Sequence, residues 1–179
     1  LSGAVMAELI VTGMNPMLAI IVACLLGLFL GAINGFVISY GRIAPFIATL
    51  ATMTIYRGAT LVFTNGNPIS SLTTDHAFRA FGRGDLLGIP IPAITMFIIF
   101  FVLWFVLQKT SLGRHTYAVG GSEKVSFNAG IKINRIKIFA YALTGLLCAI
   151  AGAIITSRLN SAQPTAGAGY ELDAIAAVV

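Results

Sequence analysis

The residues of this chain that could do chemistry are few and scattered. Its 179 residues include two histidines, two cysteines and six aspartates and glutamates. His76 lies beside Asp75, but such a pair needs a nucleophile or a second metal ligand before it can act as a base or hold an ion. Cys24 and Cys148 lie in apolar runs without metal-ligand spacing. The sequence therefore predicts no catalytic residues, no metal site, no redox chemistry and no enzyme activity in this chain.

The C-terminal stretch RLNSAQPTAGAGYELDAIAAVV carries polar side chains that could hydrogen-bond a small solute. It is rich in small residues and contains Gln163, Tyr170, Glu171 and Asp173. A broken or re-entrant helix there would line a cavity, because unsatisfied amides are costly in lipid. The alternative is an exterior loop leading into a further helix, whose first turn the two acids would stabilise through the helix dipole. The sequence leaves both alternatives open.

One cation, Arg57, interrupts an otherwise apolar run over residues 45–63. An ionisable residue inside a membrane helix is costly unless it extends to an interface or faces a polar cavity. Arg57 lies about two turns from the end of this run. Two roles therefore stay open for it, anchoring at the lipid headgroups and a place in a solute pathway.

The segment from Lys109 to Lys137 concentrates positive charge between two apolar runs. It holds six of the eleven lysines and arginines, together with Gly120-Gly121 and Glu123. No GxxxxGK[ST] or GxGxxG pattern surrounds the glycines, so nucleotide binding is not expected. The charge is compact rather than spread along a binding face, which argues against nucleic acid as a partner. Because a loop that served orientation alone could be any cluster of cations, we expect this one to dock another protein.

The elements that must position these residues are membrane helices. The chain is 58% hydrophobic and 9% charged, with a mean hydropathy of +0.93, whereas soluble domains carry charge at about 25% of positions. Runs long enough to cross a roughly 30 Å hydrocarbon core predict spans at about 17–39, 45–63, 91–108 and 138–157, with another element starting after 173. We expect an all-α, polytopic transmembrane helical bundle, in which residues 1–179 are part of a single domain. Since the chain starts with Leu and ends in an apolar run, we expect a fragment of a larger protein.

Small residues recur in two of these spans at the spacing that lets helices approach closely. The two sets are Gly27, Gly31 and Gly35 in the first span and Gly145, Ala149 and Gly152 in the fourth. We expect both sets to pack against other helices.

Lysines and arginines near span ends orient a membrane protein, with the more basic loops on the cytoplasmic side. The Lys109–Lys137 segment should therefore be cytoplasmic, and alternation puts the turn around Arg42 on the same side. Segments 1–16 and 64–89 should face outward. The second of these is predicted to be an aqueous loop, because Asn-Gly and Asn-Pro pairs mark turns in it.

Three stretches of the chain resemble one protein family in their order and spacing. They are NGFVISYGRIAPFIATLATMTIYRGATLVFTNGNPI at 34–69, SLGRHTYAVGGSEKVSFNAGI at 111–131 and SAQPTAGAGYELDAIAAVV at 161–179. The family is the permease subunits of bacterial ABC sugar importers, of the branch that carries ribose and related monosaccharides. Single motifs would be weak evidence, but three in sequence are specific, and the likeness covers essentially the whole chain.

The resemblance implies a multi-pass permease subunit of the bacterial inner membrane that acts with other proteins. Two permease chains, as a homodimer surrounded by membrane lipid, would form the channel. A periplasmic sugar-binding protein would deliver the monosaccharide, expected to be ribose. A separate cytoplasmic ATPase would bind ATP and Mg²⁺, so no cofactor is expected in this chain.

The resemblance also implies a role for the basic segment, because in that family the cytoplasmic loop with a Gly-Gly-Asn-Glu pattern contacts the ATPase. Residues 109–137 would be the ATPase-coupling loop, and the pattern is matched at Gly120, Gly121, Glu123 and Gly130. The complete set of expected coupling residues is Tyr117, Gly120, Gly121, Ser122, Glu123, Lys124 and Gly130. The chain departs from the pattern where Ser122 replaces Asn and where Phe127-Asn128 replaces Arg-Leu.

A translocation path for a sugar should be lined by side chains that bind hydroxyl groups. The residues expected in it are Asn34, Arg57, Gln163, Tyr170, Glu171 and Asp173. The alternative function is an ion-coupled secondary carrier of a small polar solute, which needs a buried acid or histidine. The four expected spans contain no acid, so the sequence favours the ATP-driven importer.

Overall fold

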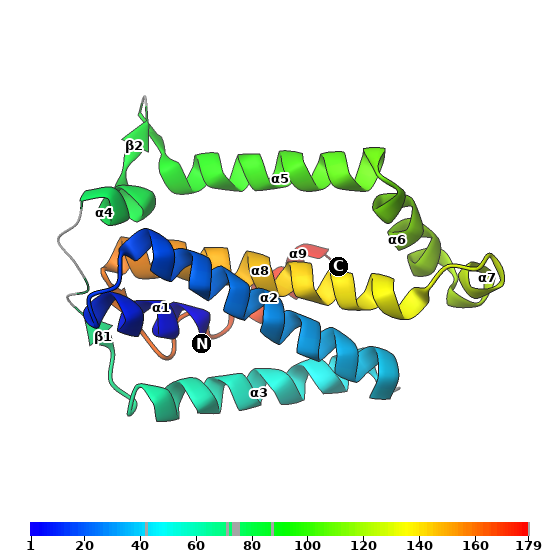
Figure 1. Ribbon diagram of the computed structural model, residues 1–179, viewed down its shortest axis with the longest axis horizontal. Helices are drawn as coiled ribbons and strands as arrows, with labels where there is room; N and C mark the ends of the chain where they lie inside the picture. The colour runs from blue at the N-terminus through cyan, green and yellow to red at the C-terminus, as the bar shows by residue number, and fades with distance from the viewer. Residues whose placement is uncertain (42, 71, 73–75, 87, 179) are drawn as a thin grey trace.

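Most of the chain is helical in the computed structural model (Figure 1). The structure describes residues 1–41, 43–70, 72, 76–86 and 88–178, without the side chains of 76, 77, 79 and 86. Arg42, Asp75 and the His76 side chain, considered above, lie outside this description. The helices are α1 (Ser2–Val11), α2 (Pro16–Gly41), α3 (Pro45–Phe63), α4 (His76–Arg83), α5 (Ile91–Lys109), α6 (Ser111–Gly121), α7 (Glu123–Asn128), α8 (Ile133–Leu159) and α9 (Tyr170–Val178). Two short antiparallel ribbons pair β1 (Ile69–Ser70) with β4 (Ser161–Ala162) and β2 (Asp85–Leu86) with β3 (Ile89–Pro90). The predicted all-α class is confirmed.

Four of the described helices, α2, α3, α5 and α8, are long and apolar enough to cross a membrane. They overlap the four ranges expected from the sequence. The largest difference is at α8, which begins at Ile133 rather than near 138. The extra turn forms because isoleucines recur at helical spacing among its cations, and Ile136 is buried with 8% of its surface exposed.

α2 and α8 pack along one another in the centre of the molecule (Figure 1). A Cβ atom added to Gly27 would lie 2.5 Å from the Ala149 Cβ, and one added to Gly145 would lie 2.9 Å from the Gly31 Cα. Only glycine fits such an approach, so the expected packing role of these glycines is confirmed. Gly152 differs, because it faces α1, with Ser2 Oγ 3.8 Å from its added Cβ.

The opening of the chain contains a packed helix, which the sequence analysis did not predict within residues 1–16. Met6 and Ala7 of α1 have no exposed surface. They join Ala23 of α2 and Ala153 of α8 in the hydrophobic core. At ten residues, α1 is too short to be recognised as a span, so hydropathy alone did not reveal it.

The described parts of the 64–89 segment contain regular structure that the prediction of an aqueous loop did not include. Helix α4 packs against α8, with Phe78 only 1% exposed. Ser157 Oγ on α8 donates a hydrogen bond to the Phe78 carbonyl oxygen at 2.5 Å. β1 from the same segment pairs with β4, with Ile69 opposite Ala162. These contacts attach α4 and β1 to the end of α8 and to β4.

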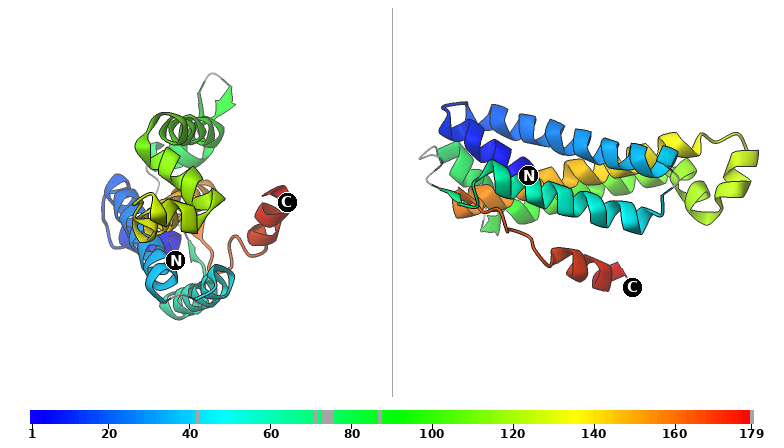
Figure 2. Two further views of the ribbon diagram at one scale, coloured as in Figure 1. Left: turned by 90° about the vertical axis from the view of Figure 1, so that its right-hand side faces the viewer. Right: turned by 90° about the horizontal axis from the view of Figure 1, so that it is seen from below.

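The connections gather at the two ends of the long helices. α6 and α7 project beyond one end, which is also the end of the α2–α3 turn, whereas α4 and the ribbons lie at the other end (Figure 1). This is the arrangement that the predicted topology requires. α3 and α5 flank the central pair on opposite sides, and α9 stands away from them (Figure 2). None of the described residues of α5 is buried.

Candidate functional site

A cavity of about 370 Å³, here called the outer cavity, lies toward the end of the bundle that carries α4. Its walls come from α1, α3, α8, the 161–167 segment and the start of α9. The volume falls at the lower end of the range of small-molecule sites, about 300–1,000 Å³. The polar residues in its lining are Ser2, Thr60, Thr156, Ser161, Gln163 and Tyr170. A space of this size, with hydroxyl and amide groups around it, suits a small polar solute.

Arg57 and Glu171, which are far apart in the sequence, meet beside the outer cavity. Arg57 Nη2 lies 4.0 Å from Glu171 Oε1, and the two side chains keep 40% and 38% of their surface exposed. Thr60 follows Arg57 by one helical turn and Tyr170 precedes Glu171, and both line the cavity. The pair joins α3 to α9 while leaving each charged group accessible to a solute.

In the C-terminal stretch, the sequence left open a re-entrant helix and an exterior loop that leads into a further helix. The chain forms β4, a series of turns and then α9, which begins at Tyr170 rather than after residue 173. Glu171 lies in the first turn of α9, and its Oε2 accepts a hydrogen bond from the Gly169 amide at 3.0 Å. The expected stabilisation of a helix N-terminus by an acid is therefore present. The same carboxylate also faces Arg57, so one residue serves the helix and the site.

The remaining path residues are divided between the cavity and other places. Gln163 and Tyr170 line the outer cavity. Asp173 is exposed on α9 and lines none of the described cavities. Two lining residues, Thr60 and Thr156, were missed by the sequence analysis, although both are at least 95% buried. The spacing of Thr60 from Arg57, which puts the two on one helix face, is a signal that could have identified it.

Asn34 lies on α2, away from the outer cavity. Its Oδ1 atom is buried, and no described group donates a hydrogen bond to it. It shares a helix face with Leu30, whose carbonyl oxygen accepts a hydrogen bond from the Tyr56 hydroxyl of α3 at 3.2 Å. A buried amide oxygen without a donor is costly, so Asn34 is a buried polar group on α2 that a solute hydroxyl could satisfy.

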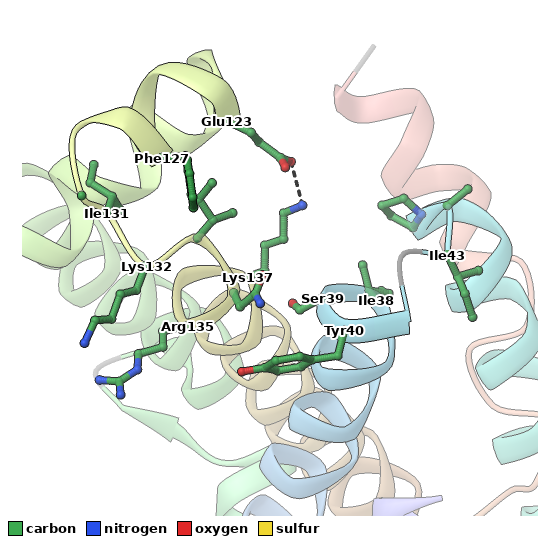
Figure 3. Close-up of a pocket in the computed structure, with 15 residues that line it drawn as sticks. Ile38, Ser39, Tyr40, Ile43, Glu123, Phe127, Ile131, Lys132, Arg135 and Lys137 are labelled. Atoms are coloured by element: carbon green, nitrogen blue, oxygen red, sulfur yellow. Dashed lines mark ion pairs between the residues drawn. The ribbon is translucent and has the colours of Figure 1, made fainter.

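A larger cavity of about 990 Å³, here called the inner cavity, lies between the α2–α3 turn and the α7–α8 connection. Figure 3 shows Glu123 of α7 and Lys137 of α8 pointing toward one another across it. Glu123 Oε1 lies 2.7 Å from Lys137 Nζ. This ion pair ties α7 to the first turns of α8, in addition to the backbone between them.

Local hydrogen bonds fix both ends of α7. Ser122 is its N-cap, and the Ser122 Oγ accepts a hydrogen bond from the Val125 amide at 3.4 Å. Because Ser and Asn cap helices about equally well, the departure from the family pattern at this position retains the cap. Gly130 has a φ of +80°, which glycine adopts readily, and the Ile131 amide bonds to the Ser126 carbonyl at 3.0 Å. This is the Schellman ending of a helix.

α6 and α7 expose large apolar side chains. Tyr117 and Val125 have 63% and 67% of their surface exposed, and Phe127, which lines the inner cavity, has 72% exposed. A Cβ atom added to Gly120 or Gly121 would meet nothing within 4 Å, and Lys124 is exposed beside them. Large apolar side chains exposed beyond the membrane helices are typical of a surface that contacts another protein. Val125 and Phe127 were not among the predicted coupling residues.

Metal-ligating side chains do not gather anywhere in the part of the chain that the structure describes. Within it, no group of three or more His, Cys, Asp and Glu residues is placed to hold a metal ion.

Comparisons with known proteins find that the chain is similar to permeases of transport systems. At 61% identity, all 179 residues align with the ribose import permease protein RbsC of Bacillus subtilis (strain 168), of which they cover 56%. The ribose import permease protein RbsC of Escherichia coli (strain K12) is 48% identical over 181 aligned positions, which include the whole chain and 56% of that protein. The D-allose transport system permease protein AlsC of the same strain is 38% identical, with all of this chain and 55% of the relative covered. The chain thus spans about half the length of these relatives.

No solved structure matches the chain. One family, however, matches it from residue 1 to residue 179, and its description is "Branched-chain amino acid transport system / permease component". Four of the chain's described helices are able to cross a membrane, and the whole of the chain aligns with permeases. The chain therefore belongs to this family of transport-system permease components.

Proposed function

We propose that the chain is part of the membrane-spanning permease subunit of an ATP-driven ABC importer. The observation that carries the proposal is the position of α8. This helix lines the outer cavity through Thr156 near its C-terminal end, and it holds α7 through Lys137 near its N-terminal end. One element therefore contacts both the candidate solute site and the candidate docking segment.

The proposed substrate is a monosaccharide, and ribose is the first candidate. The names of these relatives concern ribose and D-allose, whereas the family description names branched-chain amino acids. The outer cavity favours the sugar, because threonine, serine, glutamine and tyrosine side chains supply hydroxyl and amide groups along its wall. A polyol can hydrogen-bond to such groups, and loose placement of these groups allows release.

The energy source in this proposal is a separate cytoplasmic ATPase that holds ATP and Mg²⁺. It docks on the exposed surface of α6 and α7, where Tyr117 and Val125 offer apolar contacts and Gly121 allows close approach. ATP binding closes the ATPase and displaces α7. The Glu123–Lys137 pair passes this displacement to α8, and the helical bundle changes between outward- and inward-facing states.

The other partners follow from the membrane setting. The chain is a multi-pass protein of the bacterial inner membrane, and a periplasmic sugar-binding protein docks at the end that carries α4. A second permease chain completes the path as a homodimer. The need for such neighbours is supported by α5 and α9, whose described residues are all at least partly exposed.

The runner-up, an ion-coupled carrier, would use an acid in the path as its ion site. Glu171 is the acid that the structure places beside the outer cavity, and it is paired with Arg57. The guanidinium of Arg57 would repel a sodium ion bound at this carboxylate. This favours the ATP-driven importer.

The proposal is tested with the full-length permease, reconstituted in nanodiscs with its ATPase. ATP hydrolysis is recorded with a panel of binding proteins, each loaded with a different sugar. We expect the ribose-loaded binding protein to stimulate ATP hydrolysis. The Gly121→Glu variant should lose this stimulation although the permease still inserts into the membrane. Failure of the permease to retain the ATPase would overturn the proposal.

A further inference from the structure

The inner cavity carries more positive charge than its acidic residue can balance. Lys132, Arg135 and Lys137 line it together with Glu123, and Glu123 is already paired with Lys137. Among the described residues, neither Lys132 nor Arg135 forms an ion pair. Figure 3 shows their charged ends on the same side of the cavity, and the Tyr40 ring extends its hydroxyl toward that side. Two cations are therefore available to hold an anion.

The wall of the inner cavity also contains a buried polar atom that lacks a partner. The Oγ atom of Ser39 is buried, and no described group forms a hydrogen bond with it. Ser39 lines the cavity. Because buried hydroxyls in native proteins are nearly always hydrogen-bonded, this atom is a second and independent sign of a polar ligand.

The rest of the lining is largely apolar, with Ile38, Ile43, Phe127 and Ile131 among its residues. The cavity lies where α2 ends, at the level expected for cytoplasmic headgroups. A ligand that fits must present an anion to the two cations and hydrocarbon to the isoleucines. Basic pockets between membrane helices on the cytoplasmic side bind anionic lipid headgroups.

From these contacts we propose that the inner cavity binds the phosphodiester headgroup of an anionic phospholipid of the inner leaflet. Lys132 and Arg135 hold the phosphate oxygens, and the hydroxyls of Ser39 and Tyr40 meet the polar atoms of the headgroup. Inorganic phosphate offers the same charge but would leave the apolar wall uncovered. The inference requires the cytoplasmic orientation of this end of the protein, and it is independent of which sugar is carried.

The test uses the full-length permease in nanodiscs of phosphatidylcholine with a minor fraction of phosphatidylglycerol. After extraction, native mass spectrometry measures the lipid that stays bound. The wild-type protein should retain phosphatidylglycerol preferentially. Lys132→Gln/Arg135→Gln should lower this retention about 25-fold, or about fivefold for each cation. Ser39→Ala, which leaves the charge unchanged, should lower it by up to about fivefold through the lost hydrogen bond.

The matched control is Lys109→Gln/Arg114→Gln, which removes the same charge from residues that do not line the cavity. This variant should keep the wild-type retention. Equal retention of the two lipids by the wild-type protein overturns the proposal. An equal loss of phosphatidylglycerol in both double variants also overturns it, because the retention would then depend on surface charge in general and not on the cavity. Displacement of phosphatidylglycerol by millimolar inorganic phosphate would assign the site to free phosphate and overturn the proposal of a lipid ligand.

Discussion

Glu123 Oε1 on α7 lies 2.7 Å from Lys137 Nζ on α8, and the far end of the same helix carries Thr156 into the wall of the outer cavity. α8 has 27 residues, and at 1.5 Å per residue a helix of that length is about 40 Å long. Its glycine-mediated packing on α2 leaves no space for the two helices to move independently. A displacement of α7 can therefore reach the outer cavity through one stiff element.

Removing this ion pair should weaken coupling more than folding. Glu123→Gln keeps the shape of the side chain but loses its charge. Because Lys137 and Glu123 are 27% and 56% exposed, we expect stability to change by less than about 1 kcal/mol. Stimulated ATP hydrolysis should fall by up to about fivefold, the factor equivalent to that energy. The measurement is hydrolysis by the reconstituted complex, together with the melting temperature of the permease.

The matched comparison for this variant is Glu8→Gln, the same change at an exposed carboxylate of α1 that is outside any ion pair among the described residues. The charge exchange Glu123→Lys/Lys137→Glu should recover part of the lost stimulation. If Glu8→Gln were as harmful as Glu123→Gln and the exchange recovered nothing, the pair would have no part in coupling.

Packing between α2 and α8 should be intolerant of any side chain at the central glycines. A Cβ atom on Gly145 would overlap the Gly27 carbonyl oxygen, so Gly145→Leu forces the helices apart. We expect a loss of about 1–3 kcal/mol in stability, as overpacking typically causes. Gly58→Leu is the matched control, because an added Cβ there meets nothing within 4 Å. Thermal unfolding in detergent compares them, and equal melting temperatures would contradict the packing.

Hydropathy and turn residues were sufficient to locate the long helices, since a span of this length has few alternative structures in a membrane. Pro45, for instance, marks the start of α3 because its fixed φ suits the first helical position. The short helices were not predictable in the same way. α1 and α4 owe their order to tertiary contacts, such as the burial of Met6 and Phe78, and the surrounding sequence carries no sign of these contacts.

The candidate site was predictable as a set of residue types but not as an arrangement. Arg57 and Glu171 were each predicted as possible path residues, yet their meeting depends on how α9 returns toward α3. Asn34 was expected in the same path, but it lies on a helix face that the outer cavity does not reach. The capping role of Ser122, by contrast, is local, because residues within one turn determine it.

The Arg57–Glu171 pair should show non-additivity in mutants. Either Arg57→Gln or Glu171→Gln alone leaves one charge unmatched, and because the two side chains are 40% and 38% exposed, the lost pairing should cost less than about 1 kcal/mol. We expect each single variant to lower stability and sugar uptake. The double variant Arg57→Gln/Glu171→Gln should recover stability, although not uptake. Additive losses in thermal unfolding would show that the two side chains act independently.

Thiol labelling should place the two cavities on opposite sides of the membrane. The background for labelling carries Cys24→Ala and Cys148→Ala, because Cys148 itself lines the outer cavity, together with the replacement of any cysteine elsewhere in the full-length permease. In intact cells, a membrane-impermeant reagent should label Gln163→Cys from outside, with protection by the transported sugar. Lys124→Cys should react only after the membrane is opened. Labelling of both variants in intact cells would contradict the topology.

Uptake of radiolabelled ribose tests the proposed function most directly. The full-length permease and its ATPase are placed in proteoliposomes that enclose ATP, and the ribose-loaded binding protein is added outside while all ion gradients are collapsed. We predict uptake that requires ATP and that falls in Glu123→Gln in parallel with hydrolysis. Ribose uptake driven by an imposed proton or sodium gradient without ATP would contradict the account.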